Sequence, residues 1–175
     1  MARSYKERMN DITTFIFDVD GVLTDGSVFV TNEGEILRTM NIRDGYAMKA
    51  AVESGYNVCI ISGGSNEGVR VRLRNLGITD IHLGTPDKVE TFKEYIELYN
   101  IKPEHVLYMG DDIPDYHVMQ LVGLPSCPQD ASPEIKSISN YISHIIGGHG
   151  AARDVIEQVM KVQGKWMAHF DGKLD

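Results

Sequence analysis

The 175-residue sequence predicts an α/β fold with a doubly wound parallel sheet. Short apolar runs alternate with helical patterns along most of the chain, as they do in right-handed βαβ units. Three of these runs end in polar clusters, which are Asp18 with Asp20, Ser62-Gly63-Gly64 and Gly110-Asp111-Asp112. Because the carboxyl ends of parallel strands share one edge of a sheet, we expect the clusters to converge on one crevice.

The first half of the chain contains two strands, a hairpin and two helices. Apolar runs predict strands at 12–17 and 56–61, and helices are expected at 45–54 and 65–76, ended by Gly55 and Gly77. Between the first strand and the first helix, residues 27–40 alternate in polarity around Asn32-Glu33-Gly34. This alternation predicts a β-hairpin in which Gly34 supplies a positive φ.

The second half continues the alternation of strands and helices. The expected elements are a strand at 81–83, a helix at 87–100, a strand at 106–109, a helix near 115–122, a strand or loop reaching Cys127, a helix at 132–138, a strand at 141–142 and a helix at 150–163. We expect residues 1–175 to form one domain with a hairpin flap at about 26–40. The tail 166–175 is expected to be mobile unless it docks on a neighbouring subunit.

Composition limits the classes of partner. A net charge of −8 argues against a general nucleic-acid binder. No apolar run approaches the length of a membrane span, and the N-terminus lacks an apolar signal region, so we expect a cytoplasmic protein without a membrane partner. Cys59 and Cys127 lie in apolar surroundings, which predicts buried free thiols.

Asp18 and Asp20 form the first polar cluster. They stand at the carboxyl end of a predicted strand, and because a strand has a period of two, both side chains are expected to point to the same side. Two adjacent carboxylates repel each other unless a cation lies between them, and Mg²⁺ binds through one or two carboxylates together with waters and substrate phosphate. The pair therefore predicts a reactive aspartate, a second acid and a Mg²⁺ site, whereas the alternative is a solvated acidic turn.

The remaining clusters suggest groups that bind phosphate and metal. Ser62 and the glycines after it offer a hydroxyl and open backbone N–H groups at a helix start, although such turns are common without a ligand. Lys88 opens a helix and could neutralise a phosphate and a nucleophile, the alternative being a solvated charge. Asp111 and Asp112 could bind metal or cap a helix, and Asp115 has the helical spacing to support either.

The order Asp-x-Asp-Gly, Ser-Gly, Lys and Gly-Asp-Asp across residues 12–115 resembles the haloacid dehalogenase superfamily of aspartate-nucleophile phosphatases. The resemblance implies a Rossmann-like core in which Asp18 is the nucleophile and forms an aspartyl-phosphate. It implies that Asp20 protonates the leaving oxygen and then activates water. The other implied roles are phosphate binding by Ser62, Gly63 and Lys88, Mg²⁺ binding by Asp18, Asp111 and the backbone carbonyl of Asp20, and support by Asp112 and Asp115.

Neither gap between the motifs leaves room for the cap domain that many members of this superfamily insert. Residues 26–61 hold only the hairpin, one helix and one strand, and residues 63–87 hold one helix and a short strand. An open crevice would expose the reactive intermediate to water, so another surface must close it. The hairpin is too small to be stable alone, so we expect it to pair with neighbouring subunits. The apolar side chains available for this pairing are Val28, Phe29, Val30, Ile36 and Leu37.

The capless chain with this hairpin resembles the tetrameric phosphatases of eight- and nine-carbon sugar acids. The resemblance covers about residues 10–165 and is carried by segments 18–26, 43–46, 110–112 and 147–155. It implies a homotetramer that acts on a phosphorylated sugar acid in lipopolysaccharide biosynthesis. Nonulosonate 9-phosphate phosphatases carry an acidic residue where this chain has Gly64, which favours 3-deoxy-D-manno-octulosonate 8-phosphate as the substrate.

The carboxylate of a sugar acid requires a cation, and arginine is the better bidentate partner. Arg43, before the Asp44-Gly45 turn, is the first candidate. Further candidates are Arg70 and Arg72, together with His149 and Arg153, which could reach a neighbour's site. Solvated surface charge and helix capping are the alternative roles for these side chains.

Within enzymes, the alternatives are a nonulosonate 9-phosphate phosphatase and a broad sugar-phosphate phosphatase. A phospho-aspartate receiver shares the architecture, the acidic cluster and the lysine, but it has no need of an acid/base such as Asp20. A non-catalytic binding subunit is disfavoured because every catalytic position is filled.

Overall fold

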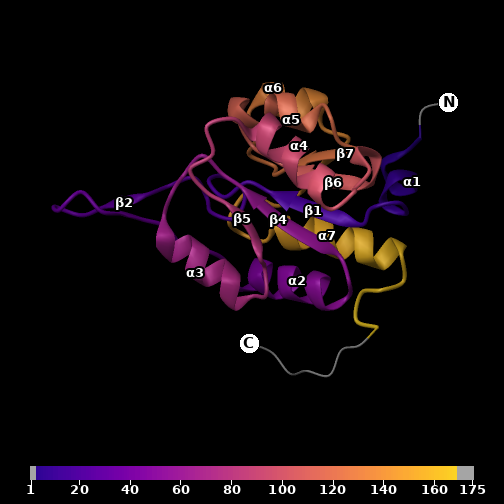
Figure 1. Cartoon of the computed structure of the whole chain (residues 1–175), viewed down its shortest axis with the longest axis horizontal. Helices are drawn as coiled ribbons and strands as arrows, with labels where there is room; N and C mark the ends of the chain where they lie inside the picture. The colour runs from indigo at the N-terminus through magenta and orange to yellow at the C-terminus, as the bar shows by residue number, and fades with distance from the viewer. Residues whose placement is uncertain (1–2, 169–175) are drawn as a thin grey trace.

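The computed structural model describes residues 3–168 and contains a six-stranded sheet of order β5-β4-β1-β6-β7-β8 (Figure 1). All of its strand pairs are parallel. The strands are β1 (Thr14–Phe17), β4 (Asn57–Ile61), β5 (Asp80–His82), β6 (Val106–Met109), β7 (Leu124–Cys127) and β8 (Tyr141–Ile142). The predicted doubly wound parallel sheet is confirmed, and β1 lies at the point where the strand order reverses direction.

Helices cover both faces of the sheet (Figure 1). One face carries α2 (Ile42–Glu53), α3 (Glu67–Asn75) and α7 (Ala151–Val162), and the other carries α4 (Lys88–Leu98), α5 (Tyr116–Met119) and α6 (Pro133–Ile138). Because side chains alternate along a strand, Phe15 and Phe17 pack toward α2 and α7, whereas Ile16 packs toward α4. Each face therefore has its own apolar core, and β1 contributes to both.

The predicted hairpin forms a separate two-stranded sheet of β2 (Phe29–Val30) and β3 (Ile36–Leu37). Gly34 in its turn has a φ of +85°, as expected. The hairpin projects away from the body of the molecule in Figure 1, and its five apolar side chains are 45–69% exposed. The connection from β1 to β4 thus consists of this hairpin and α2.

Several helix boundaries differ from the sequence prediction. Helix α2 begins three residues before the expected start at 45, because the Asn41 side chain accepts hydrogen bonds from the backbone N–H groups of Arg43 and Asp44. The N-terminal helix α1 (Tyr5–Met9) was not predicted. The expected helix near 115–122 is a 3₁₀ turn, η2 (Ile113–Asp115), followed by α5, and a second 3₁₀ turn, η1 (Pro103–His105), precedes β6.

Other expectations concern the cysteines, the tail and membrane spans. Cys59 and Cys127 are buried free thiols, as predicted. Most of the tail 166–175 lies outside the described residues, but the Trp166 ring packs edge-on to Tyr46 with centroids 6.2 Å apart. Among residues 3–168, no helix combines the length and the apolar character needed to cross a bilayer.

Candidate active site

The three predicted polar clusters line one pocket, because β1 lies between β4 and β6 and all three strands end at the same edge. The pocket measures about 350 Å³. Its lining residues follow the ends of these strands or begin α4, and they are Asp18, Asp20, Gly21, Gly26, Ser62, Gly63, Gly64, Lys88, Asp111, Asp112, Pro114 and Asp115. The predicted convergence of the clusters on one crevice is therefore present in the structure.

Asp18 is the first residue after β1 and is held at the floor of the pocket. Its N–H donates to the carbonyl of Met109 (3.1 Å), its Oδ1 accepts from the N–H of Val19 (2.7 Å), and its Oδ2 lies 2.9 Å from Lys88 Nζ. Burial, together with the nearby charge of Asp115, raises the pKa of Asp18 to about 7 even though Lys88 opposes the shift. One carboxylate oxygen is thus fixed by the backbone while the side chain stays at the pocket surface.

Lys88 is the first residue of α4 and bridges two carboxylates. Its Nζ lies 2.7 Å from Asp115 Oδ1 in addition to its contact with Asp18. Burial lowers the pKa of Lys88, but the two carboxylates outweigh burial and raise it above its ordinary value. The lysine is therefore a fixed cation in the pocket, as predicted, and it is not a solvated surface charge.

Asp115 supports this arrangement with both carboxylate oxygens. Oδ1 accepts hydrogen bonds from Lys88 and from the Tyr108 hydroxyl (2.8 Å), and Oδ2 accepts from the N–H of Asp111 (3.1 Å). A side chain at position 110 would collide with Asp115, so only glycine allows this close approach. Asp115 therefore holds Lys88, the Tyr108 hydroxyl and the Asp111 backbone in a fixed arrangement.

Asp111 has the character of a metal ligand. One carboxylate oxygen from each of Asp18, Asp111 and Asp115 lies within 4.8 Å of the others. Burial and the neighbouring carboxylates raise the pKa of Asp111 to about 7, and within residues 3–168 its side chain accepts no hydrogen bond. A Cβ at Gly21, which has a φ of +84°, would collide with the Asp111 carboxylate. Lys88 alone does not balance these acids, so the donor set fits a divalent cation.

Asp20 lies at the rim of the pocket, and its carboxylate faces Arg38. Strand β1 ends at Phe17, so Asp18 and Asp20 lie in the turn after it and the argument from strand periodicity does not apply to them. Both residues still line the pocket, but Asp18 contacts Lys88 whereas Asp20 contacts Arg38 at 2.6 and 3.1 Å. Two carboxylates two positions apart in the chain are thus paired with different cations.

Ser62 and its two glycines form a short loop, and the predicted helix start at this point is not present. Helix α3 begins at Glu67, where the Asn66 side chain caps it by accepting from the N–H of Val69 (3.0 Å). Ser62 is buried, and its Oγ accepts from the N–H of Gly64 (3.3 Å). Ser62, Gly63 and Gly64 line the Asp18 pocket, so the residues predicted to bind phosphate are present there without a helix N-terminus behind them.

The segment 147–150 packs directly on the loop after Asp20. The N–H of Gly148 donates to the carbonyl of Val22 (2.9 Å), and a Cβ at Gly147 would collide with the Gly21 carbonyl. The glycine-rich motif before α7 therefore buttresses the turn that carries Asp20 and Gly21.

The proposed substrate arginines and His149 lie away from the Asp18 pocket. Arg43, His149 and Arg153 line a separate cavity of about 640 Å³ that runs along α7. The N–H of Arg153 donates to Asp44 Oδ1 (2.8 Å), and its guanidinium lies 5.4 Å from the Trp166 ring centroid. The Asp44 side chain thus caps the start of α7, which gives part of the motif 43–46 a structural role.

The two candidates on α3 also lie outside the Asp18 pocket. Arg70 pairs with Glu67 (3.2 Å) and donates to the Ile81 carbonyl (2.9 Å), so it is engaged in holding β5. Arg72 lines a groove of about 440 Å³ beside the base of the hairpin, together with Leu37 and Arg38. Within the described chain, then, none of the candidates for the substrate carboxylate reaches the pocket of its own subunit.

Arg38 and Tyr108 contact aspartates of the pocket but were not predicted as site residues from the sequence. Arg38 belongs to the strand pattern of the hairpin, and its contact with Asp20 depends on how the hairpin folds back. Tyr108 lies in an apolar strand and reads as core, although burial of a tyrosine hydroxyl is a signal that a hydrogen-bond partner must be nearby. Neither role could be assigned from spacing alone.

Comparisons with known proteins agree with this site. The family model of haloacid dehalogenase-like hydrolases matches residues 77–153. The 3-deoxy-D-manno-octulosonate 8-phosphate phosphatase of Salmonella typhi is 40% identical over 158 residues, which are 90% of this chain and 84% of the relative. The crystal structure of the phosphatase of that name from Yersinia pestis has a TM-score of 0.92 at 36% identity, covering 96% of this chain and 91% of that one.

A third protein was solved with ligands. The 3-deoxy-D-manno-octulosonate 8-phosphate phosphatase from Moraxella catarrhalis, in complex with a magnesium ion, a phosphate ion and a KDO molecule, has a TM-score of 0.90 at 31% identity and covers 94% of each chain. The resemblance found in the motifs is confirmed by similarity over almost the whole chain. The chain belongs to the haloacid dehalogenase-like hydrolases, in the family of the 3-deoxy-D-manno-octulosonate 8-phosphate phosphatases.

Proposed function

We propose that the protein is a Mg²⁺-dependent phosphatase that hydrolyses 3-deoxy-D-manno-octulosonate 8-phosphate through an aspartyl-phosphate on Asp18. The observation that carries the proposal is the pairing of buried Asp18 with Lys88 beside the Ser62 loop, in a pocket with an excess of carboxylates. Such a pocket offers a nucleophile, groups that hold phosphate and a place for a divalent cation. Phosphoryl transfer needs chiefly this positioning and charge compensation.

The first step of the proposed reaction is attack of an Asp18 carboxylate oxygen on phosphorus. The bond from phosphorus to the sugar oxygen breaks, and Asp20 gives its proton to that oxygen. In the second step water attacks the phosphorus, the bond to Asp18 breaks, and the Asp20 carboxylate takes the proton from the water. The products are the dephosphorylated sugar acid and inorganic phosphate, and both aspartates have returned to their starting protonation states.

The remaining pocket residues hold the phosphoryl group and the metal. Ser62, Gly63 and Lys88, which line the pocket beside Asp18, would hold the phosphoryl group, with Asp112 and Asp115 in support. Asp18, Asp111 and the backbone carbonyl of Asp20 would hold Mg²⁺. When bound, this ion supplies positive charge that screens the repulsion between the carboxylate nucleophile and the phosphate.

Support for the sugar-acid substrate comes from the relatives and from Gly64. The named activity of the Salmonella typhi relative and the ligands in the Moraxella catarrhalis structure concern an eight-carbon sugar acid. In this chain Gly64 lies between Ser62 and the Arg38–Asp20 pair, where a longer acidic side chain would meet them. A cytoplasmic location and a role in lipopolysaccharide biosynthesis follow the same resemblance.

A homotetramer of a single capless domain, residues 1–175, is part of the proposal. The exposed hairpin presents apolar side chains that a second copy of the chain would bury. A neighbouring subunit would also be the source of a cation for the substrate carboxylate, for which Arg72 and Arg153 are candidates. None of them reaches the pocket of its own subunit in the described chain.

The test is a turnover screen of phosphorylated sugars and sugar acids with Mg²⁺. We expect 3-deoxy-D-manno-octulosonate 8-phosphate to have the highest kcat/KM. Higher kcat/KM for a nonulosonate 9-phosphate, or equal values for many neutral sugar phosphates, would reject the proposed specificity. Absence of phosphate release from every monoester would reject the proposed activity.

A further inference from the structure

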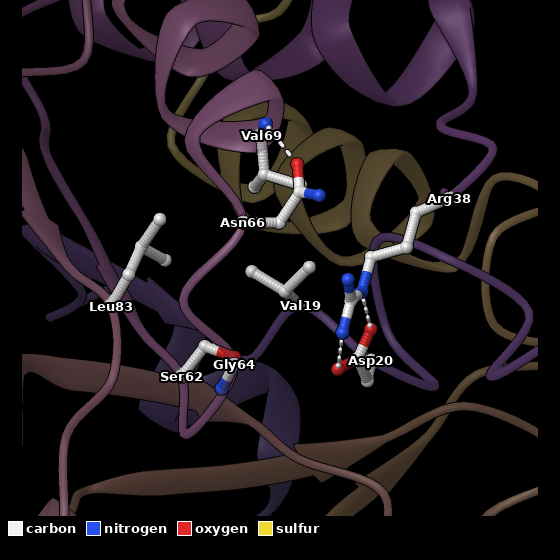
Figure 2. A pocket seen from close by; sticks show the side chains of 8 residues that line it. All are labelled: Val19, Asp20, Arg38, Ser62, Gly64, Asn66, Val69 and Leu83. Carbon is white, nitrogen blue, oxygen red and sulfur yellow. Dashed lines mark hydrogen bonds and ion pairs between the residues drawn. The ribbon is translucent and has the colours of Figure 1, made fainter. Parts of the chain in front are cut away.

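Arg38, directly after β3, makes a bidentate ion pair with Asp20. Its Nε lies 2.6 Å from Oδ1 and its Nη2 lies 3.1 Å from Oδ2 (Figure 2). The Arg38 side chain is 12% exposed, whereas that of Asp20 is 40% exposed. The cation is therefore the fixed partner of the pair, and the carboxylate at the pocket rim is the partner that it orients.

The base of the hairpin is held in place by the loop on the other side of the pocket. The Asn66 side chain donates to the carbonyl of Ile36 (3.0 Å) while its oxygen caps α3. At Gly64, a Cβ would lie 3.2 Å from Arg38 Nη2 and 3.3 Å from Asp20 Oδ2, so the ion pair rests directly on this loop. Arg38 thus stands between the hairpin and the groups that hold phosphate.

Asp20 has few other constraints. Within residues 3–168, its carboxylate accepts hydrogen bonds from Arg38 alone, and it lies beyond the end of β1. A half-exposed aspartate with a single partner would otherwise sample several rotamers. The planar guanidinium fixes both oxygens at once, which a point charge would not do.

We propose that Arg38 is a positioning residue that holds the Asp20 carboxyl group in register with the leaving oxygen and with the attacking water. The inference rests on the proposed function. Asp20 becomes a carboxylate when it gives its proton to the leaving oxygen, and it stays a carboxylate until it takes a proton from water. Arg38 pairs with Asp20 in that form and holds it at the pocket rim between the two steps.

The test uses two classes of substrate that differ in their need for an acid. A sugar or alkyl phosphate has a poor leaving group that must be protonated, whereas p-nitrophenyl phosphate has a leaving group that departs as a stable anion. Loss of a positioned Asp20 should therefore slow the first class much more than the second. The ratio of the two kcat values measures the acid step separately from the binding of phosphate.

The variants are Arg38→Met, which keeps an apolar stem, and Arg38→Lys, which keeps the charge. Arg3→Met is the matched control, because Arg3 also pairs with an aspartate at 2.6 Å but lies at the N-terminus. General acid–base catalysis contributes roughly 10²–10⁴-fold, so Arg38→Met should change the kcat ratio by at least about 10-fold, with Arg38→Lys in between. KM for both substrates should change little, and the control should retain the wild-type ratio.

A second comparison separates positioning from a structural role. In an Asp20→Asn background the acid is already lost, so adding Arg38→Met should cause no further change in the ratio. Equal losses for both substrate classes, an effect confined to KM, or additive losses in the double variant would overturn the inference while leaving the phosphatase assignment intact. If circular dichroism shows that Arg38→Met does not fold, the same comparison is made with Arg38→Lys and Arg38→Gln. A wild-type protein inactive on both classes would overturn the proposed function and this inference together.

Discussion

Replacement of Lys88 by methionine is the perturbation whose size the structure defines best. Lys88 is the shared partner of Asp18 and Asp115, at 2.9 and 2.7 Å, and the three side chains are at most 10% exposed. Methionine preserves the aliphatic stem but leaves buried carboxylates without their cation. Breaking a buried ion pair from one side costs about 3–5 kcal/mol, so we expect the free energy of unfolding to fall by about that amount at pH 8 without metal.

The loss should depend on pH in a defined direction. Burial and neighbouring carboxylates raise the pKa of Asp18 and of Asp111 from 3.8 to about 7 in the folded protein. The folded state therefore binds more protons than the unfolded state between these values, and metal-free stability rises as the pH falls from about 8 toward 4. Without Lys88 the carboxylates take up protons at still higher pH, so the destabilisation should be smaller at pH 5 than at pH 8.

The assay is urea denaturation of wild type and Lys88→Met at pH 8 and pH 5, each in chelator and in Mg²⁺. Asp18→Asn combined with Lys88→Met is the matched variant, because it removes one carboxylate together with the cation and should recover part of the lost stability. A destabilisation below about 1 kcal/mol at pH 8 would show that the lysine is effectively solvated, since exposed pairs contribute only that much. A loss of equal size at both pH values would refute the electrostatic reasoning.

Three further predictions follow from the same pocket and from the hairpin. Asp18→Asn should abolish turnover while circular dichroism shows an intact fold, and turnover within about tenfold of wild type would exclude Asp18 as nucleophile. Chelation should stop hydrolysis, and addition of Mg²⁺ should restore it. Mg²⁺ should also raise the melting temperature more at pH 8 than at pH 6, because protons compete with the ion for Asp18 and Asp111. Charges at Val28 and Val30 should dissociate the proposed tetramer, as measured by light scattering, because each buried apolar side chain contributes roughly 1.5–3 kcal/mol. A fully active, selective wild-type monomer would contradict this.

The sheet was predictable because buried parallel strands read as continuous apolar runs. Residues 14–17, 57–61 and 106–109 have this character and end in polar clusters, so their shared edge follows from topology alone. Helix α1 was missed because five residues carry no periodicity, although the capping box of Ser4 and Glu7 is visible in the sequence. Short elements depend on local caps and on contacts that periodicity does not measure.

The candidate site was predictable as a set of residues but only partly as a geometry. Asp18, Ser62, Lys88 and Asp111 line one pocket because each follows a neighbouring strand or opens the next helix. The direction of Asp20 could not be derived, since it depends on the turn after β1. Its partner Arg38 lies 18 residues away, across a hairpin whose path no sequence pattern fixes.

Arg38 connects the hairpin directly to Asp20, the proposed acid and base of the reaction. The apolar part of the hairpin is exposed, yet its base contacts Asp20 and Asn66 at the pocket. Because a two-stranded hairpin is marginally stable alone, a neighbouring subunit that binds its exposed side chains would also restrict Arg38. If the proposed tetramer forms, its dissociation should then affect the acid step before it affects phosphate binding. The Val28 and Val30 variants should consequently lose turnover of the sugar-acid phosphate and still hydrolyse an aryl phosphate slowly, with the same change of kcat ratio as Arg38→Met. A proportional loss on both substrates would show that assembly acts on the pocket by another route, such as residues supplied by the neighbour.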